Sequence, residues 1–359
     1  MNRRLAAAAA LATVCLAAAA GAQAATVETV VSGLDNPRGV SIAPDGAVYV
    51  ANSGRAGRQC QGKGEERGCF GPTGRIVRVV NGQKSTVAKG FQSFGAPGGA
   101  FAGGVGGVSV APDGAVFALT GSGEPAFIRS LPKAIRSQAG RVFNVSGGNL
   151  DAVARVDTLE WKQNLDNVKG DRNSNPYAIL ALADRQIVAD AGANAVLEVR
   201  GSDVELLAVI PKNRKKSQPV PTSLAVDPVS GDIFVGELAF GGGKGRARVW
   251  RIPAAGGTPT LHATGFTAIT GIAFGPDGSL FVTEFDRKPR TEASEGRVVR
   301  VAPDGSRTSL GANKLVWPTG AAVDAAGAVY VSNYSVLPRK TPKKSPFRGK
   351  GGTLVKITP

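Results

Sequence analysis

The sequence predicts an all-β protein, a six-bladed β-propeller whose four-stranded antiparallel blades surround a central channel. Three observations predict this fold. A two-strand module recurs six times along the 359 residues, each copy continues into further strands, and the strand missing from the last copy is present near the N-terminus. A repeat of roughly 40–50 residues that carries four strands is the signature of a propeller.

The module is clearest in residues 39–52, GVSIAPDGAVYVAN, which predict a short strand, a Pro-Asp-Gly turn and a second strand. Asp favours the turn through its side-chain hydrogen bond, and Gly allows the positive φ that the turn needs. The second strands are nearly continuous apolar runs, as expected for a blade covered on both faces. Related modules occupy residues 107–120, 178–191, 223–237, 271–284 and 320–333.

Further strands follow each module. Third strands that begin on a small residue are predicted at residues 74–80, 140–145, 195–200, 247–253, 296–303 and 352–359. Fourth strands are predicted at residues 85–91, 153–159, 205–211, 259–266 and 307–315. The sixth copy has no fourth strand, and residues 26–34, TVETVVSGL, have the character of the missing one. We therefore expect the N-terminal strand to pair with the last blade and close the ring.

Residues 1–24 have the pattern of a signal peptide: Arg3 and Arg4, an apolar run over residues 5–20, and a small-x-small cleavage site that ends at Ala24. Cleavage there would leave a single propeller domain, residues 25–359. The arginine pair leaves the export route open between Sec and Tat. No later stretch reaches the ~18 apolar residues of a membrane span. The sequence thus predicts a secreted or periplasmic protein.

Two cysteines, Cys60 and Cys69, remain once the predicted signal peptide with Cys15 is removed. An exported chain with two nearby cysteines favours a disulfide between them. A zinc site is disfavoured, because two thiolates without a nearby histidine cannot complete tetrahedral coordination.

In such a blade, the connection between the second and third strands emerges on the same face as the connection to the next blade. We call this the top face, and we expect function there, since its predicted loops are the long ones. Residues 160–166 are expected to form one or two helical turns, and the glycine-rich runs 95–107 and 241–245 to be flexible connections. The long connections are residues 53–73, 121–139, 160–176, 211–221, 238–246, 285–295 and 334–351.

The net charge of +16 is concentrated in these top-face loops. The sequence predicts a basic patch of Lys212, Arg214, Lys215, Lys216, Arg339, Lys340, Lys343, Lys344, Arg348 and Lys350. Such a patch favours an acidic partner: an anionic glycan, an envelope polymer or an acidic protein. Nucleic acid is disfavoured, because the chain is predicted to be exported and shows no aromatic stacking motif. The alternative is that the charges only keep the protein soluble.

Polar residues are predicted at the mouth of the channel, where second strands end and first strands begin. They are Arg38, Asn52, Tyr177, Asp190, Glu237, Glu284 and Asn333. Asp190, Glu237 and Glu284 offer oxygen ligands of the kind that Ca²⁺ takes. The alternative is that these residues merely end strands near solvent. The single histidine, His262, is predicted on an outer strand far from the channel, which disfavours a Ser-His-Asp triad. The sequence therefore identifies no catalytic residue, and catalysis would have to use carboxylates or a metal.

Several ordered motifs resemble the ScyD/ScyE family of exported propellers, named for a cyanobacterial gene cluster that makes the pigment scytonemin. The motifs are residues 34–39 (LDNPRG), 60–74 with the two cysteines, 174–177 (SNPY), 188–192 (VADAG), 220–223 (VPTS), 235–238 (VGEL) and 263–266 (ATGF). Asn173 stands before the SNPY motif where the family has an aspartate. The resemblance implies an exported propeller and implies little about chemistry, because fold alone does not fix function.

Two functional hypotheses follow. The first is a non-catalytic or accessory protein whose basic top face recognises an acidic ligand or partner. The alternative is a metal-dependent hydrolase of the lactonase or esterase type, with its site at the top of the channel. Gluconolactonase-type propellers hold their metal with acidic or amide side chains where first strands begin. Here Arg38, Tyr177 and the three threonines Thr222, Thr270 and Thr319 occupy those positions, which counts against the alternative.

Overall fold

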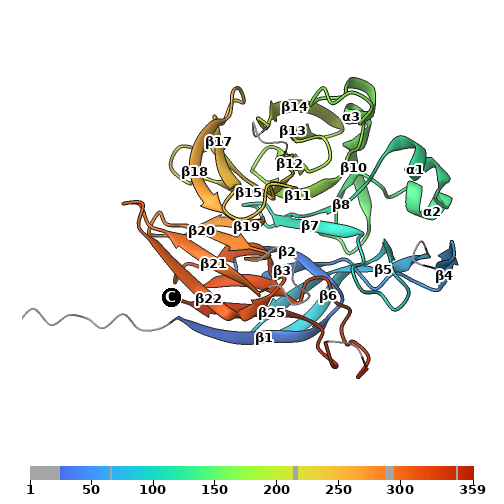
Figure 1. The fold of residues 1–359 in the computed structure, drawn as a ribbon, viewed down its shortest axis with the longest axis horizontal. Coiled ribbons are helices and arrows are strands. Elements are labelled where there is room, and N and C mark those ends of the chain that lie inside the picture. The colour runs from blue at the N-terminus through green and yellow to red at the C-terminus, as the bar shows by residue number, and fades with distance from the viewer. Residues whose placement is uncertain (1–24, 65–66, 213–216, 288–294, 345–346) are drawn as a thin grey trace, which may run out of the picture.

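The structure is a computed structural model that describes residues 25–64, 67–212, 217–287, 295–344 and 347–359. Six antiparallel sheets surround a central axis, each one a blade (Figure 1). The prediction of a six-bladed β-propeller is confirmed. The predicted signal peptide, residues 1–24, lies outside the described residues.

In every blade the first strand lies next to the channel. Blade 1 consists of β2 (Pro37–Ile42), β3 (Val48–Asn52), β5 (Gly68–Val80) and β6 (Gln83–Gly95), blade 2 of β7 (Val105–Val110), β8 (Val116–Thr120), β9 (Arg141–Asn144) and β10 (Asp151–Arg155), and blade 3 of β11 (Pro176–Ala181), β12 (Gln186–Asp190), β13 (Ala195–Arg200) and β14 (Asp203–Val209).

The second half of the ring repeats the arrangement. Blade 4 consists of β15 (Pro221–Val226), β16 (Ile233–Glu237), β17 (Ala247–Ile252) and β18 (Thr260–Phe266), blade 5 of β19 (Ile269–Phe274), β20 (Leu280–Glu284), β21 (Glu295–Val301) and β22 (Arg307–Val316), and blade 6 of β23 (Thr319–Val323), β24 (Val329–Asn333) and β25 (Gly352–Thr358), joined by β1 (Thr26–Leu34).

The ring is closed by β1, as predicted. This strand pairs antiparallel with β25, with Thr26 opposite Thr358 at one end and Leu34 opposite Gly352 at the other (Figure 1). The buried Leu34 packs in a core cluster that contains residues of blade 1 and blade 6. The N-terminal strand therefore completes one blade and also contributes to the contact between the first and the last blade.

The hairpin turns form as the sequence predicts. In three modules the turn aspartate accepts a hydrogen bond from the backbone N–H two residues later: Asp45 from Ala47 at 3.0 Å, Asp113 from Ala115 at 2.9 Å and Asp277 from Ser279 at 3.0 Å. The glycine of the first turn, Gly46, has a φ of 80°, which explains why glycine occupies it. Every residue of the second strands β3, β12, β16 and β20 is buried, because neighbouring blades cover both faces.

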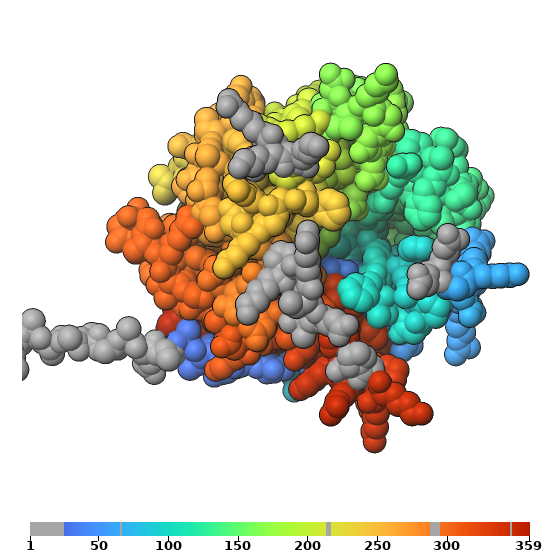
Figure 2. Space-filling view, viewed as in Figure 1, coloured from blue at the N-terminus to red at the C-terminus, as the bar shows by residue number. Residues whose placement is uncertain are grey.

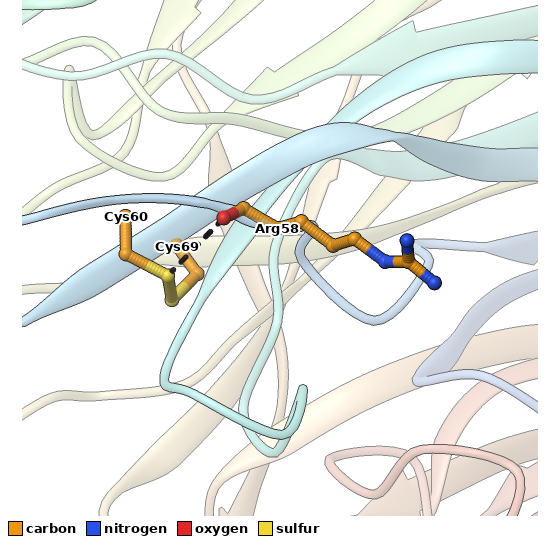
Figure 3. The surroundings of a disulfide bond; sticks show 3 residues. All are labelled: Arg58, Cys60 and Cys69. Atoms are coloured by element: carbon orange, nitrogen blue, oxygen red, sulfur yellow. Dashed lines mark hydrogen bonds between the residues drawn. A yellow bond between two sulfur atoms is a disulfide. The ribbon is translucent and has the colours of Figure 1, made fainter.

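Blade 1 differs from the prediction. Its outer hairpin, β5 and β6, is longer than the predicted strands 74–80 and 85–91, and the short strand β4 (Gln59–Gln61) pairs with β5 inside the predicted loop 53–73. Cys60 on β4 lies directly opposite Cys69 on β5, and the two form the predicted disulfide (Figure 3). A disulfide points to a compartment outside the reducing cytoplasm.

Three short helices lie in the top-face connections of blades 2 and 3. Helices α1 (Pro125–Ser130) and α2 (Lys133–Arg136) occur where the sequence predicts only a loop. Helix α3 (Asp157–Gln163) begins three residues before the predicted turns at 160–166, since Asp157 and Glu160 both lie in its first turn, where acidic side chains are favourable.

Figure 2 shows the face from which long connections project. Within the described residues no helix has the length and apolar character needed to span a membrane.

Deletion of residues 26–34 is expected to destabilise the protein strongly, because β25 would lose its pairing partner and the cluster around Leu34 would open. The point substitution Leu34→Ala is expected to cost about 2–5 kcal/mol of unfolding free energy, as for other buried leucines. Chemical denaturation of both variants, beside a control that lacks only residues 1–24, measures the effect. An unchanged denaturation midpoint in the deletion variant would show that β1 does not close the ring.

Candidate functional site

The channel is narrow and is lined by the first strands. Its upper part is a cavity of about 60 Å³ with walls of small and apolar residues and three threonines, Thr222, Thr270 and Thr319. Each threonine hydroxyl donates to a backbone carbonyl of the following blade: Thr222 to Ile269 at 2.6 Å, Thr270 to Pro318 at 2.9 Å and Thr319 to Pro37 at 3.2 Å. These side chains connect consecutive blades around the channel.

Four of the polar residues that end second strands support the chain just before the first strand of their own blade. Asn52 Oδ1 accepts the backbone N–H of Asp35, Asp190 Oδ1 that of Asn175, Glu284 Oε1 that of Thr267, and Asn333 Oδ1 that of Val316, each at 2.7 Å. All four side chains are buried. Their geometry matches the alternative interpretation, in which they have a structural role at the strand ends.

The three carboxylates predicted as calcium ligands have separate partners. Glu237 receives hydrogen bonds from Arg248 Nε at 2.6 Å and Trp250 Nε1 at 2.9 Å, and burial raises the pKa of this carboxyl above its ordinary value despite those bonds. Glu284 pairs with Arg297. Burial also raises the pKa of Asp190, to about 6, although Ser174 and three backbone N–H groups donate to it.

A calcium site of the predicted composition does not fit this geometry. Among the residues that the structure describes, no group of three or more histidine, cysteine, aspartate and glutamate side chains is arranged to hold a metal ion. The carboxylates lie in blades 3, 4 and 5 and are satisfied there, while the threonine hydroxyls at the channel donate to backbone. The prediction that Asp190, Glu237 and Glu284 converge on one cation therefore finds no support in the described residues.

The remaining two channel-mouth residues are half-buried at the upper end of the first strands. Arg38 Nη2 donates to the carbonyl of Ala102 at 3.3 Å, which directs its side chain toward the connection between blades 1 and 2. Tyr177 lines the channel cavity. His262 lies on the outer strand β18, is exposed and contacts Phe234 edge to face, as expected for a histidine outside any triad.

The predicted basic patch contains cations that are paired with carboxylates, cations outside the described residues and cations that are exposed. Arg339 is engaged: its guanidinium pairs with buried Asp35, which also accepts Arg75 Nη2 at 2.9 Å. Burial alone would raise the pKa of Asp35, but the hydrogen bonds and charges of the two arginines hold it below its ordinary value. The Nζ of Lys212 lies 3.9 Å from Oδ2 of Asp166, so this lysine is also paired with a carboxylate. Arg214, Lys215 and Lys216 lie outside the described residues.

The last part of the patch is exposed. These are the cations that follow Arg339 in the connection between β24 and β25, and none of them forms a salt bridge with another described residue. They are Lys340, Lys343, Lys344, Arg348 and Lys350. We call them the 340–350 cluster.

Sequence reasoning missed a pocket of about 170 Å³ on the top face, which we call the upper pocket. It lies between the upper end of the β5–β6 hairpin and the α1–α2 segment. Its walls are mostly apolar, with exposed aromatic rings of Phe94 and Phe127 that meet edge to face 6.1 Å apart. Further apolar lining residues of the α1–α2 segment are Ile128, Leu131 and Ile135.

The helices that form this pocket left a weak signal in the sequence. Pro125 begins α1, where proline is favourable, and Ile128, Leu131 and Ile135 recur at helical spacing. These three residues pack with Phe70 of β5, so that the hairpin and the helices support each other. Because each helix is shorter than two turns, neither is recognisable without the partner that buries it.

Polar groups at the floor of the upper pocket are mostly engaged. Ser122 Oγ donates to buried Asp157 at 2.7 Å, and Asp157 also accepts Arg155 Nε at 2.8 Å. Burial is the main reason that the pKa of Asp157 is raised, although Arg155 and Ser122 act against it. Gln138 bridges the backbone of Gln92 and Gly90. The arrangement therefore offers a ligand mainly apolar contact.

Four phenylalanine side chains on or beside the top face are exposed, which the sequence did not predict. Phe94, Phe101, Phe127 and Phe240 are all at least 38% exposed. They belong to the top-face connections or to the end of the β5–β6 hairpin that borders them. The absence of an aromatic stacking motif was one argument against nucleic acid as a partner, and these four exposed rings weaken that argument.

The fold is similar to that of solved propellers with other sequences. A gluconolactonase from Xanthomonas campestris is 11% identical with a TM-score of 0.53, over 93% of this chain and 89% of that one. An aldose sugar dehydrogenase from Streptomyces coelicolor, solved with PQQ bound, is 14% identical with a TM-score of 0.55, over 93% and 98%. The calcium-binding protein regucalcin from Agrobacterium tumefaciens is 14% identical with a TM-score of 0.50, over 91% and 90%.

At these identities the likeness shows the fold alone. No family model matches the chain, and no curated protein matches its sequence. The resemblance to the ScyD/ScyE family is therefore supported only as far as the β-propeller fold, which the chain shares with these structures.

Glu160 gives the protein a testable pH dependence. Burial, together with the charges of Asp166, Asp190 and Asp171, raises the pKa of Glu160 from 4.5 to about 7, against a hydrogen bond from the Leu165 N–H. Because the folded protein binds this proton more tightly than the unfolded chain, its contribution to stability is complete below pH 4.5 and is lost as the pH rises to about 7.

The substitution Glu160→Gln keeps a side-chain carbonyl for Leu165 and removes the titration. We expect it to flatten the decline in unfolding free energy between pH 5 and 8 and to stabilise the protein most at pH 8. Urea denaturation across this range is the measurement. If the variant and the parent protein lose stability in parallel, the raised pKa of Glu160 is wrong.

Proposed function

We propose that this chain is an exported, non-catalytic propeller that recognises an acidic ligand or partner through its top face. The single observation that carries the proposal is the 340–350 cluster: five exposed cations on one connection, without salt bridges to other described residues. Arg339, at the start of this connection, is held by Asp35, so the segment that displays the cations is anchored to the ring.

The remaining features agree with binding. The polar residues at the channel mouth hold the chain in place, and the upper pocket offers apolar walls instead of paired catalytic groups. Export is part of the proposal: it follows from the signal-peptide pattern of residues 1–24, and the Cys60–Cys69 disulfide supports it. Such a protein would meet anionic glycans, envelope polymers or acidic proteins. Membership of the ScyD/ScyE family, whose motifs the sequence carries, belongs to this proposal.

Binding through exposed cations must weaken as salt screens the charges, over a Debye length of ~10 Å at 0.1 M. We expect the variant with all five residues of the 340–350 cluster changed to glutamine to elute from an anionic matrix at a clearly lower salt concentration. Arg339 is left unchanged because it supports the fold. The matched control exchanges lysine and arginine at the same five positions and should elute with the parent protein. Equal elution of all three proteins would remove the cluster from the proposal.

The lactonase or esterase alternative rests on the fold likeness to gluconolactonases and on nothing in the described side chains. We expect the purified protein to bind less than one equivalent of divalent metal and to hydrolyse neither lactones nor aryl esters. Elemental analysis and a substrate panel with and without chelator test this. Stoichiometric metal together with chelator-sensitive turnover would establish the alternative and reject the proposal.

A further inference from the structure

Helices α1 and α2 have a second face. On the side toward α3 lies a hollow of about 380 Å³, which we call the basic hollow. Its polar lining consists almost entirely of cations, with one tryptophan and one serine: Arg129, Lys133, Arg136, Arg155, Trp161 and Ser137. It is distinct from both the upper pocket and the 340–350 cluster, and the sequence analysis assigned nothing to it.

The base of the hollow is fixed by contacts. Arg155 is paired with buried Asp157, at 2.8 Å from Nε to Oδ1 and 3.3 Å from Nη2 to Oδ2, and its guanidinium lies 5.0 Å from the centre of the Trp161 ring. The indole Nε1 of Trp161 donates to the carbonyl of Gly123 at 3.0 Å, which ties α3 to the chain just before α1. A ligand would meet an arginine and an aromatic ring that are already held in place.

The rim carries unbalanced charge. Arg129, Lys133 and Arg136 are exposed, and none of them forms a salt bridge within the described part of the chain. The one carboxylate at the base, Asp157, is committed to Arg155 and Ser122. Three like charges around one hollow repel each other, and an anion between them relieves that repulsion. The hollow is thus suited to a ligand that carries at least one oxyanion.

The volume of the basic hollow and the presence of Trp161 in its lining indicate a ligand larger than an inorganic ion. A sulfate or phosphate ion alone would fill little of the hollow and would not reach the part of the Trp161 side chain that lines it beside Arg155. A sugar residue fills such a space, can place its C–H groups against the part of Trp161 that Arg155 and the α1–α2 cluster leave open, and can carry a sulfate, phosphate or carboxylate toward the rim. The disulfide points to a compartment outside the cytoplasm, where anionic glycans are a more accessible ligand than nucleic acids.

We propose that the basic hollow between α1–α2 and α3 binds an anionic sugar residue of a glycan, with Lys133 and Arg136 contacting the oxyanion and Trp161 the sugar. This inference rests on the proposed function, since it names the class of acidic ligand that the top face would take. It adds a defined site that recognises one residue of the glycan, beside the less specific attraction of the 340–350 cluster.

The test uses the full chain without residues 1–24 and titrates it with a sulfated hexasaccharide. Sodium sulfate and a single-stranded oligonucleotide of equal charge serve as the other probes. We expect the hexasaccharide to bind and to change the tryptophan fluorescence. The double substitution Lys133→Gln with Arg136→Gln should weaken binding at least about tenfold, the loss typical of two charge-assisted contacts. Trp161→Phe should abolish the fluorescence change while calorimetry still detects binding.

Two control variants separate the site from general charge. Lys244→Gln with Lys314→Gln removes equal charge from exposed positions in blades 4 and 5 and should leave the affinity nearly unchanged. Lys133→Arg with Arg136→Lys keeps the charge of the hollow and should preserve binding. Thermal unfolding of each variant checks that the fold is intact.

Three results would overturn the inference: unchanged affinity in the Lys133 and Arg136 glutamine variant, an oligonucleotide that binds as tightly as the hexasaccharide, or sulfate alone with the same affinity. If hexasaccharide binding is lost only in the glutamine variant of the 340–350 cluster, the basic hollow is wrong and the proposed function stands. If neither the hexasaccharide nor an anionic matrix binds the protein, both are wrong.

Discussion

The structure depends on contact between blades around the channel, where six sheets meet at their first strands. Small residues at these strands let the sheets approach, and hydroxyls then cross from one blade to the next: Thr222 to Ile269, Thr270 to Pro318 and Thr319 to Pro37. Ser53 makes the corresponding bond from blade 1 to the carbonyl of Val105 at 2.8 Å. Since these bonds satisfy backbone groups where the blades meet, they hold neighbouring blades together independently of the long connections, which can therefore vary.

The sequence predicted what is repeated. Six copies of one module determine the blade number, the turn aspartates and the buried second strands, and the unpaired strand at residues 26–34 determines the closure. It did not show the partners of single polar residues. Glu284 ends a strand beside the channel in sequence terms, yet its carboxylate turns toward Arg297 and the Thr267 N–H. Whether a strand-ending carboxylate faces solvent or a neighbouring arginine depends on side-chain direction, which the repeat does not encode.

The top face was the least predictable part, because its short elements are stable only through their contacts with one another. The α1–α2 segment is too short to be helical alone and is held by its apolar contact with Phe70 on β5. The β5–β6 hairpin extends upward to meet it, with Cys60 and Cys69 joining β4 to β5. Arg339 likewise contributes to the positive charge of its loop in the sequence, although its guanidinium is bound to the carboxylate of Asp35, 304 residues away in the chain. Ion pairs between residues that lie far apart in the chain cannot be predicted from the charges of a single loop.

The pairing of β1 with β25 also sets an order of events. Within the ring, β1 is synthesised before every other strand but pairs with the last one, since the residue opposite Thr26 is Thr358. Until β23, β24 and β25 have been synthesised, β1 has no sheet to pair with, and Asp35 lacks Arg339. The five other blades can form in sequence, but their circular arrangement remains open, with one unpaired strand at the N-terminal side. The ring can therefore close only after β25 has been synthesised, and the loop that must close to achieve it is nearly the full length of the domain.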